Sequence, residues 1–398
     1  MGSPRVRRQA PVARPSLLLT ALLTALLTAL LTALLAACGG SGRDDAGEAA
    51  PDPSAASSTA PTTPAAASSA TPSATPSATA SATPSATAST DPTEAAKPPK
   101  VKHVVAVSVD GLNPTALTEL GEAGAPTFWR LIHEGASTFD ARTEVERTDT
   151  LPNHTGMLTG RRVDAAHGGH GVYFNDSVTG TIEDRTGVRS ASVFDVVADA
   201  GETSSLFASK YKFEVYERSW PAITEFYADP DNEQMTKEAV ADLTDHDRAF
   251  AFVHFSAPDV AGHAHTWLSP QYRDAVEETD ANLARLVDAI EHDDDLADST
   301  VLLLTADHGG NPHVGLHTVP DDPDNYTIPF LAWGAGVPRG ADLYDLNPRR
   351  HDPGDSRPGY GPGGPIRNGD IANAALDLLG LSTVPGSEFG VEDPVQVR

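Results

Sequence analysis

From residue 100 onward, the chain alternates between short apolar runs and segments with helical periodicity. Apolar runs rich in β-branched or aromatic residues predict buried strands at 104–109, 249–255, 301–304 and 328–333. Apolar positions at helical spacing predict helices over 191–200, 235–243, 272–290 and 371–379. This alternation predicts an α/β fold, with helices on both faces of a mainly parallel sheet. The aromatic, weakly periodic stretch 210–227 is expected to form a small insertion near the functional site.

Residues 1–37 have a different pattern. A basic start without acidic residues precedes an uncharged run at 16–37, built from Thr-Ala-Leu-Leu units. The run is about long enough to span a bilayer, so a permanent membrane helix is the alternative to an export signal. The run ends in Leu-Ala-Ala-Cys-Gly around Cys38, which resembles the bacterial lipobox. We therefore predict a lipoprotein signal peptide over 1–37, with a lipid on Cys38 as the only link to the outer face of the bacterial cell membrane.

Residues 38–99 consist mainly of Ala, Ser, Thr and Pro, with few charges and no aromatic residue. Such a segment cannot bury enough apolar area to offset its ordering entropy, and this predicts a disordered tether. An O-glycosylated stalk would have the same composition. The remaining residues, 100–398, suit one large catalytic domain.

Charge and cysteine content restrict the chemistry. The chain has 28 basic and 55 acidic residues, and its net charge of −27 falls almost wholly on residues 100–398. Such a surface repels a phosphate backbone, so we predict no nucleic-acid-binding surface. Because Cys38 is the only cysteine, an intrachain disulfide and a cysteine-based zinc cluster are excluded. Any catalysis must use oxygen and imidazole groups.

An aspartate follows each of three predicted strands, and functional groups of open α/β sheets gather at this edge. These residues are Asp110, Asp259 and Asp307. Each one alone could simply cap a helix. His263 and His308, however, accompany two of them on segments expected to be tight, glycine-containing loops.

Aspartate and histidine without thiolate suit zinc in an open catalytic site, with manganese or iron as substitutes. A further histidine pair, His313 and His317, follows directly. With one of this pair, the candidate ligands number six, which is too many for one open tetrahedral site and suits two divalent ions. The alternative is a set of buried histidines that are only hydrogen-bonded to aspartates.

A candidate nucleophile lies between the first two aspartates. Pro152 suits the first turn of a helix that ends by Gly160, and this places Thr150 at the helix N-terminus. Free backbone N–H groups favour an anion there. Thr150 could simply cap this helix, or it could be a nucleophile activated by a divalent ion.

Together these segments resemble the alkaline phosphatase superfamily, and the type I phosphodiesterase/nucleotide pyrophosphatase group is the most similar branch. The segments that carry the resemblance are Ser108–Gly111, Thr150–His154, Pro258–His263 and Ala306–Gly310. The similarity extends over nearly all of residues 100–398.

The resemblance implies a role for each matching residue. One metal would be surrounded by Asp110, Thr150, Asp307 and His308. The other would be surrounded by Asp259, His263 and His317, which fits the spacing to 326–330 better than His313 does. The amide of Asn175 would hold a phosphoryl oxygen.

The implied activity is hydrolysis of a small phosphodiester, such as a nucleotide, through a phospho-threonine intermediate at a two-zinc site. A phosphomonoesterase is the first alternative. It would need extra cationic groups, and Lys210 and Lys212 are interpreted here as solvated surface charges. A non-catalytic, metal-stabilised surface binding protein is the second alternative; it would be expected to lack the nucleophile or a ligand, and this chain retains both.

Overall fold

The computed structural model describes residues 100–398, which fall within one compact unit. The predictions of a signal peptide over 1–37 and a tether over 38–99 lie outside the described residues. Within 100–398, no helix has both the length and the apolar character needed to cross a bilayer.

An eight-stranded sheet forms the centre of this unit, in the order β4-β3-β5-β1-β6-β7-β2-β8. All neighbouring pairs are parallel except the two that involve β7, which runs antiparallel to β6 and β2. The strands are β1 (His103–Val109), β2 (Ala136–Arg142), β3 (Ser204–Ala208), β4 (Glu225–Ala228), β5 (Phe250–Phe255), β6 (Thr300–Thr305), β7 (Thr327–Gly334) and β8 (Ala341–Asp342). The predicted, mainly parallel sheet is confirmed.

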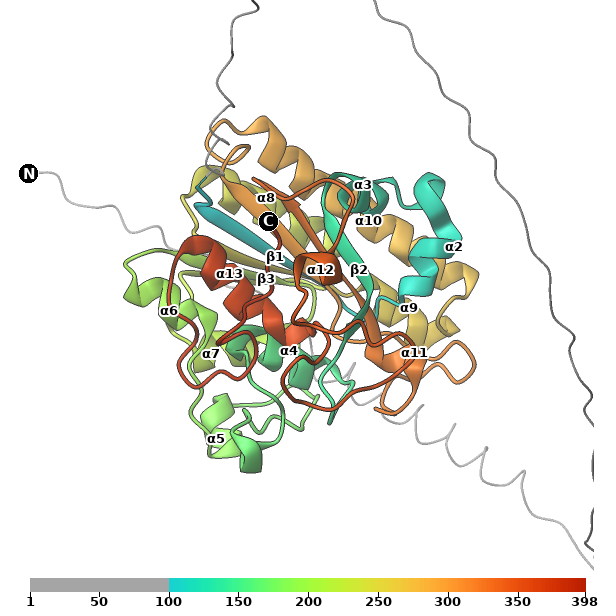
Figure 1. The fold of residues 1–398 in the computed structure, drawn as a ribbon, viewed down its shortest axis with the longest axis horizontal. Helices are drawn as coiled ribbons and strands as arrows, with labels where there is room; N and C mark the ends of the chain where they lie inside the picture. The colour runs from blue at the N-terminus through green and yellow to red at the C-terminus, as the bar shows by residue number, and fades with distance from the viewer. Residues whose placement is uncertain (1–99) are drawn as a thin grey trace, which may run out of the picture. The chain divides into compact units, whose positions relative to one another are not determined.

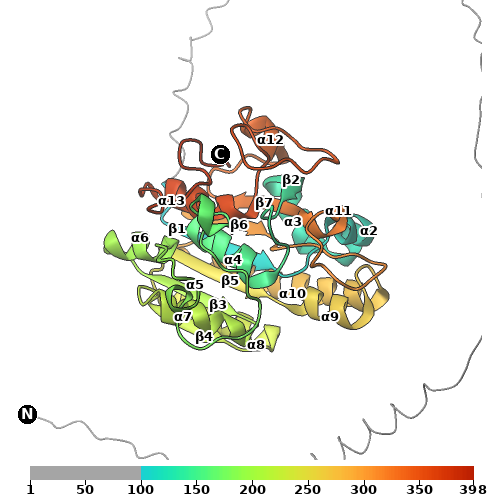
Figure 2. The same cartoon turned by 90° about the horizontal axis from the view of Figure 1, so that it is seen from below.

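Helices cover both faces of the sheet, as Figures 1 and 2 show. The α-helices are α2 (Pro114–Gly124), α3 (Pro126–Glu134), α4 (Thr150–Thr159), α5 (Ile182–Thr186), α6 (Val193–Asp199), α7 (Glu214–Ser219), α8 (Asn232–Asp245), α9 (Ala257–His265), α10 (Pro270–His292), α11 (Pro323–Tyr326), α12 (Leu343–Leu346) and α13 (Ile371–Leu379). Short 3₁₀ turns are η1 (Ala165–His167), η2 (Tyr211–Phe213) and η3 (Asn368–Asp370). Helices α4, α6 and α13 pack together, while α10 packs against α2, α3, α8 and α9.

Four predicted strands and four predicted helices are present, with ends shifted by at most a few residues. The central strands β1, β5 and β6 are buried along their whole length, which explains why they are continuous apolar runs.

The interpretation of 210–227 as an insertion is wrong, because this stretch forms η2, α7 and the edge strand β4 of the main sheet.

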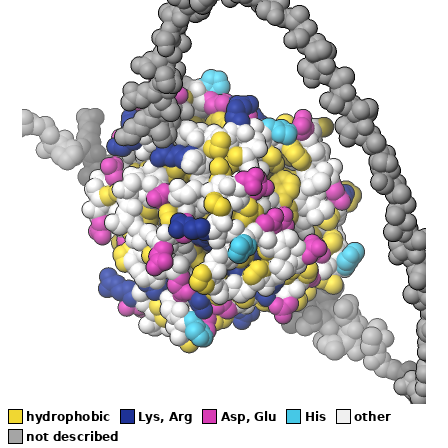
Figure 3. All heavy atoms as spheres, in the orientation of Figure 1, with side chains coloured by type: hydrophobic (Ala, Val, Ile, Leu, Met, Phe, Trp, Pro, Cys, Tyr) yellow, Lys and Arg dark blue, Asp and Glu magenta, His cyan; other side chains and the backbone are white. Residues whose placement is uncertain are grey.

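On the face of the molecule seen in Figure 3, acidic, basic and hydrophobic side chains are interspersed.

Candidate active site

The candidate residues gather at the carboxyl ends of β1, β5 and β6, beside the start of α4. Asp110 directly follows β1, and Asp307 lies two residues after β6. Asp259 was expected on a loop after β5, but it lies in the first turn of helix α9. Because His263 is four residues further along α9, both side chains lie on the same face of that helix.

The first group of candidate metal ligands is Asp110, Asp307 and His308, whose donor atoms lie within 4.8 Å of one another. Backbone N–H groups of Gly111 and His308 donate to Asp307 Oδ1 at 3.0 and 2.9 Å. The backbone carbonyl of Gly309 lies 2.8 Å from His308 Nδ1, and this contact turns Nε2 toward Asp307 Oδ2, 3.1 Å away. Asp110 Oδ1 and Asp307 Oδ2 lie 3.5 and 3.1 Å from His308 Nε2, and none of these three buried atoms has a hydrogen-bond partner outside the group. Such a cluster of donor atoms fits a divalent ion.

The second group is Asp259, His308 and His317. Asp259 Oδ1 is also buried without a hydrogen-bond partner. His317 Nδ1 lies 2.6 Å from the carbonyl of Thr148, which directs Nε2 into the site. This Nε2 lies 3.1 Å from His263 Nε2 and 3.8 Å from Asp259 Oδ1. His317 therefore lies with the candidate ligands, whereas His313 is exposed.

The carboxylates make this site attractive to cations. Burial alone would lower the pKa of His308, but Asp307, Asp110 and Asp259 raise it to about 9. Burial, together with the charge of His308, lowers the pKa of His317 to about 3, so this imidazole is neutral and can donate its lone pair. Two divalent ions would supply the positive charge that these groups require.

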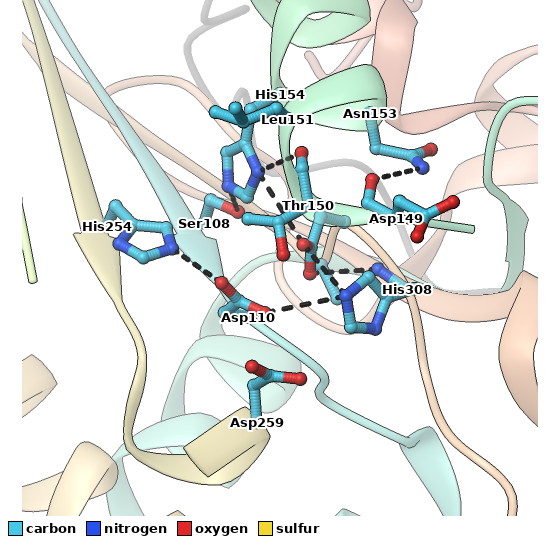
Figure 4. Close-up of polar contacts among 12 residues, drawn as sticks. Ser108, Asp110, Asp149, Thr150, Leu151, Asn153, His154, His254, Asp259 and His308 are labelled. Atoms are coloured by element: carbon cyan, nitrogen blue, oxygen red, sulfur yellow. Dashed lines mark hydrogen bonds and ion pairs between the residues drawn. The ribbon is translucent and has the colours of Figure 1, made fainter. Parts of the chain in front are cut away.

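Thr150 is the first residue of α4 and is almost fully buried. The amide of Asn153 shapes this helix start, because it accepts from the Glu144 N–H at 2.9 Å and donates to the Asp149 carbonyl at 3.0 Å. Figure 4 shows Thr150 beside Asp110 and His308, which contact each other. The predicted nucleophile is thus next to the first group of ligands.

Asn175 contacts the same end of α4. Its Oδ1 accepts from the Leu151 N–H at 2.9 Å and from Lys212 Nζ at 3.2 Å. With Oδ1 occupied by two donors, Nδ2 is the part of the amide that can donate to a phosphoryl oxygen. This arrangement fits the predicted role of Asn175.

The interpretation of Lys210 as a surface charge is wrong. Its Nζ lies 2.6 Å from Asp110 Oδ2 and 2.6 Å from Asp259 Oδ2, so it bridges one carboxylate of each group. Burial would lower the pKa of Lys210, but these carboxylates raise it above its usual value. Sequence reasoning also missed His254, whose Nε2 lies 2.9 Å from Asp110 Oδ2. The available signal was a histidine inside the apolar run of β5.

Close packing explains the glycine after Asp110. Gly111 has φ +71°, and a Cβ there would lie 3.0 Å from Asp259 Cα. Its carbonyl accepts from Trp267 Nε1 at 2.8 Å and from Tyr272 Oη at 2.7 Å. This turn therefore brings the end of β1 close to α9, so that Asp110 and Asp259 lie at the same site.

We expect the wild-type protein to retain two equivalents of zinc after gel filtration, and His317→Ala to retain one. The variant loses the imidazole that completes the second group of ligands. His313→Ala is the matched control and should retain two equivalents, because His313 is exposed on the same loop. Metal content is measured by elemental mass spectrometry. Loss of zinc from His313→Ala and not from His317→Ala would contradict the assignment.

Among curated relatives, a mouse GPI ethanolamine phosphate transferase 1 is 26% identical over 259 residues, which cover 60% of this chain and 27% of that protein. The chain therefore spans only about a quarter of that relative's length.

Two solved structures share the fold. One is murine ectonucleotide pyrophosphatase/phosphodiesterase 5, as an inactive threonine-to-alanine variant in complex with AMP; it is 15% identical with a TM-score of 0.52, covering 71% of this chain and 96% of that one. The other is a Vibrio parahaemolyticus protein of the alkaline phosphatase superfamily, 16% identical with a TM-score of 0.50, covering 75% and 72%.

A family model described as type I phosphodiesterase / nucleotide pyrophosphatase matches residues 104–328, which is more than half of the chain. That range contains every candidate metal ligand, Thr150 and Asn175. The protein belongs to the type I phosphodiesterase / nucleotide pyrophosphatase family, and its fold is that of the alkaline phosphatase superfamily.

Proposed function

We propose that the protein hydrolyses phosphodiesters through a covalent intermediate on Thr150. One observation carries the proposal: the Thr150 hydroxyl lies at the start of α4, beside buried Asp and His atoms that lack hydrogen-bond partners. A hydroxyl in such a place can be activated as a nucleophile, and the helix N-terminus favours the anionic phosphoryl group.

The chain's own residues have distinct parts in this reaction. Thr150 Oγ loses its proton and forms a bond to phosphorus, while the bond from phosphorus to the leaving alkoxide breaks and that oxygen takes up a proton. Water then attacks phosphorus, breaks the Oγ–P bond and releases a phosphomonoester. Asn175 Nδ2 donates to a non-bridging oxygen during both steps.

Two ions, held by the Asp and His ligands of the two groups, would lower the pKa of hydroxyl groups and offset charge on phosphoryl oxygens.

Ser108 and His154 hold the backbone of the proposed nucleophile in place. Ser108 Oγ lies 2.8 Å from His154 Nε2, and His154 Nδ1 lies 2.8 Å from the carbonyl of Thr150. Burial lowers the pKa of His154 to about 4, so the ring is neutral and holds the nucleophile's backbone.

Transfer to an alcohol is the second candidate function, because the curated relatives are named as phosphate transferases. An alcohol would then replace water in the second step. The two reactions share Thr150 and differ in their product, which is a new phosphodiester in a transfer. Product analysis with and without added glycerol separates them.

The direct test compares bis(4-nitrophenyl) phosphate with 4-nitrophenyl phosphate, using zinc-loaded protein. We expect a higher kcat/KM for the diester, a loss of at least about a hundredfold on chelation, and recovery when zinc is restored. Higher activity on the monoester would favour a phosphomonoesterase. Full activity after chelation, with no metal left in the protein, would contradict the proposal.

A further inference from the structure

Exposed large hydrophobic side chains are concentrated around the candidate active site. Six of the seven in residues 100–398 lie within three positions of a candidate site residue or Lys210, and their exposed fractions are 44–60%. We call these six the apolar rim: Tyr173, Tyr211, Val260, Val314, Leu316 and Val319. The seventh, Val391, is on the C-terminal segment, which supplies no candidate site residue.

The rim comes from four segments that are far apart in the sequence and meet at the site. Tyr173 precedes Asn175 and lies against the Arg147 guanidinium, 5.4 Å from the ring centre. Val314, Leu316 and Val319 flank His317. Their loop packs against the C-terminal end of α9, because a Cβ on Gly315 would lie 3.4 Å from Thr266 Cγ2 and 3.7 Å from the Gly262 carbonyl oxygen.

Tyr211 and Val260 line a cleft of about 690 Å³ together with Lys210 and Lys212. Small apolar side chains of α9 and α10 also line it: Ala257, Ala261, Ala264 and Ala275. The volume falls in the range of organic ligand sites. Through Lys210 the cleft lies next to the candidate metal ligands Asp110 and Asp259, and its wall along α9 is mostly apolar, while polar side chains such as Gln271 and Glu278 line the rest.

Single exposed hydrophobic residues are ordinary, but a concentration of them around one site indicates an interaction. Metal binding does not require exposed apolar side chains beside the ligands. Exposed side chains also contribute little to the stability of the fold, so neither role explains the apolar rim. The net charge of −27 also disfavours substrates with several negative charges. A phosphodiester with one charge and an apolar substituent meets both conditions.

We propose that the cleft and the apolar rim bind an acyl or alkyl chain of the substrate, so that the substrate class is an amphiphilic phosphodiester. This inference rests on the proposed function. The phosphate lies at Thr150 and Asn175, and the chain extends past Lys210 and Lys212 along Tyr211 and Val260. Each methylene covered by the cleft raises kcat/KM by up to about fourfold.

The test uses the full chain, zinc-loaded, with methyl, butyl and octyl 4-nitrophenyl phosphodiesters; kcat/KM is measured below the critical micelle concentration, and the rate is then followed above it. We expect kcat/KM for the octyl ester to exceed that for the methyl ester by at least about tenfold, mainly through KM. In the double variant Tyr211→Ser/Val260→Ser, this ratio should fall toward one. Val391→Ser is the matched control and should keep the wild-type ratio.

Three results would overturn the inference while leaving the proposed function intact: equal kcat/KM for all chain lengths, an unchanged ratio in the double variant, or a rise in rate only above the critical micelle concentration. The last result would indicate binding to a lipid surface instead of a single chain. If none of the esters is hydrolysed, the proposed function fails, and the inference fails with it.

Discussion

Replacing Thr150 with alanine is expected to lower the rate of phosphodiester hydrolysis by at least about a thousandfold. The variant removes the atom that would form the bond to phosphorus, and it leaves the Asp and His candidate metal ligands unchanged. The measurement is kcat on bis(4-nitrophenyl) phosphate, with metal content and circular dichroism recorded for the same preparation. Thr150→Ser keeps a hydroxyl and should retain part of the activity.

Thr159→Ala is the matched control for this prediction. Thr159 is buried on the same helix, and its hydroxyl donates to the Thr155 carbonyl at 2.7 Å, far from the ligands along α4. We expect its activity to change by less than about threefold. A loss of less than about tenfold in folded, metal-loaded Thr150→Ala would show that another group attacks phosphorus.

The second large effect is expected for Lys210→Met. Removing this ammonium leaves Asp110 and Asp259 without the cation that bridges them at 2.6 Å on each side. Loss of one partner of a buried ion pair costs about 3–5 kcal/mol, and the 15% exposure of Lys210 favours the lower end. We therefore expect a fall of about 3 kcal/mol in the free energy of unfolding of the metal-free protein.

Zinc should reduce this loss, because the bound ions neutralise the same carboxylates. Activity should still fall by about tenfold to a hundredfold, since Lys210 and His254 hold Oδ2 of Asp110, and Lys210 holds Oδ2 of Asp259, which orients both carboxylates. Chemical unfolding with and without zinc measures the first effect. Lys237→Met, on the exposed side of α8, is the control. Equal stability of Lys210→Met and wild type without zinc would contradict this account.

Local pattern was enough to predict the strands that build the site. The runs that became β1, β5, β6 and β7 are mostly apolar because both faces of the sheet are covered. In contrast, β2 is only partly buried and its pairing with β7 is irregular, while β4 is a short edge strand with intermediate or exposed residues. Such strands depend on tertiary pairing, which the sequence pattern does not contain.

Site residues that belong to a recognisable sequence motif could be predicted from the sequence. Asp110, Thr150, Asp307 and His308 stand in recognisable segments, and the structure brings them together. The position of Lys210 was not predictable, because it contacts Asp110 across 100 residues of sequence and resembles a surface lysine in its local pattern. His254 was hidden within an apolar strand for the same reason. The helical position of Asp259 was missed because the segment before His263 contains proline and glycine.

The proposed reaction depends on covalent attachment of the substrate's phosphoryl group to Thr150. The most direct measurement is an acid quench of zinc-loaded protein during turnover of a phosphodiester, followed by mass spectrometry of the peptide that contains Thr150. We expect this peptide to carry the phosphoryl group with its retained alcohol. The same peptide from chelated protein and from Thr150→Ala should carry no phosphoryl group. Steady turnover without any adduct on Thr150, or an adduct on a different residue, would contradict it.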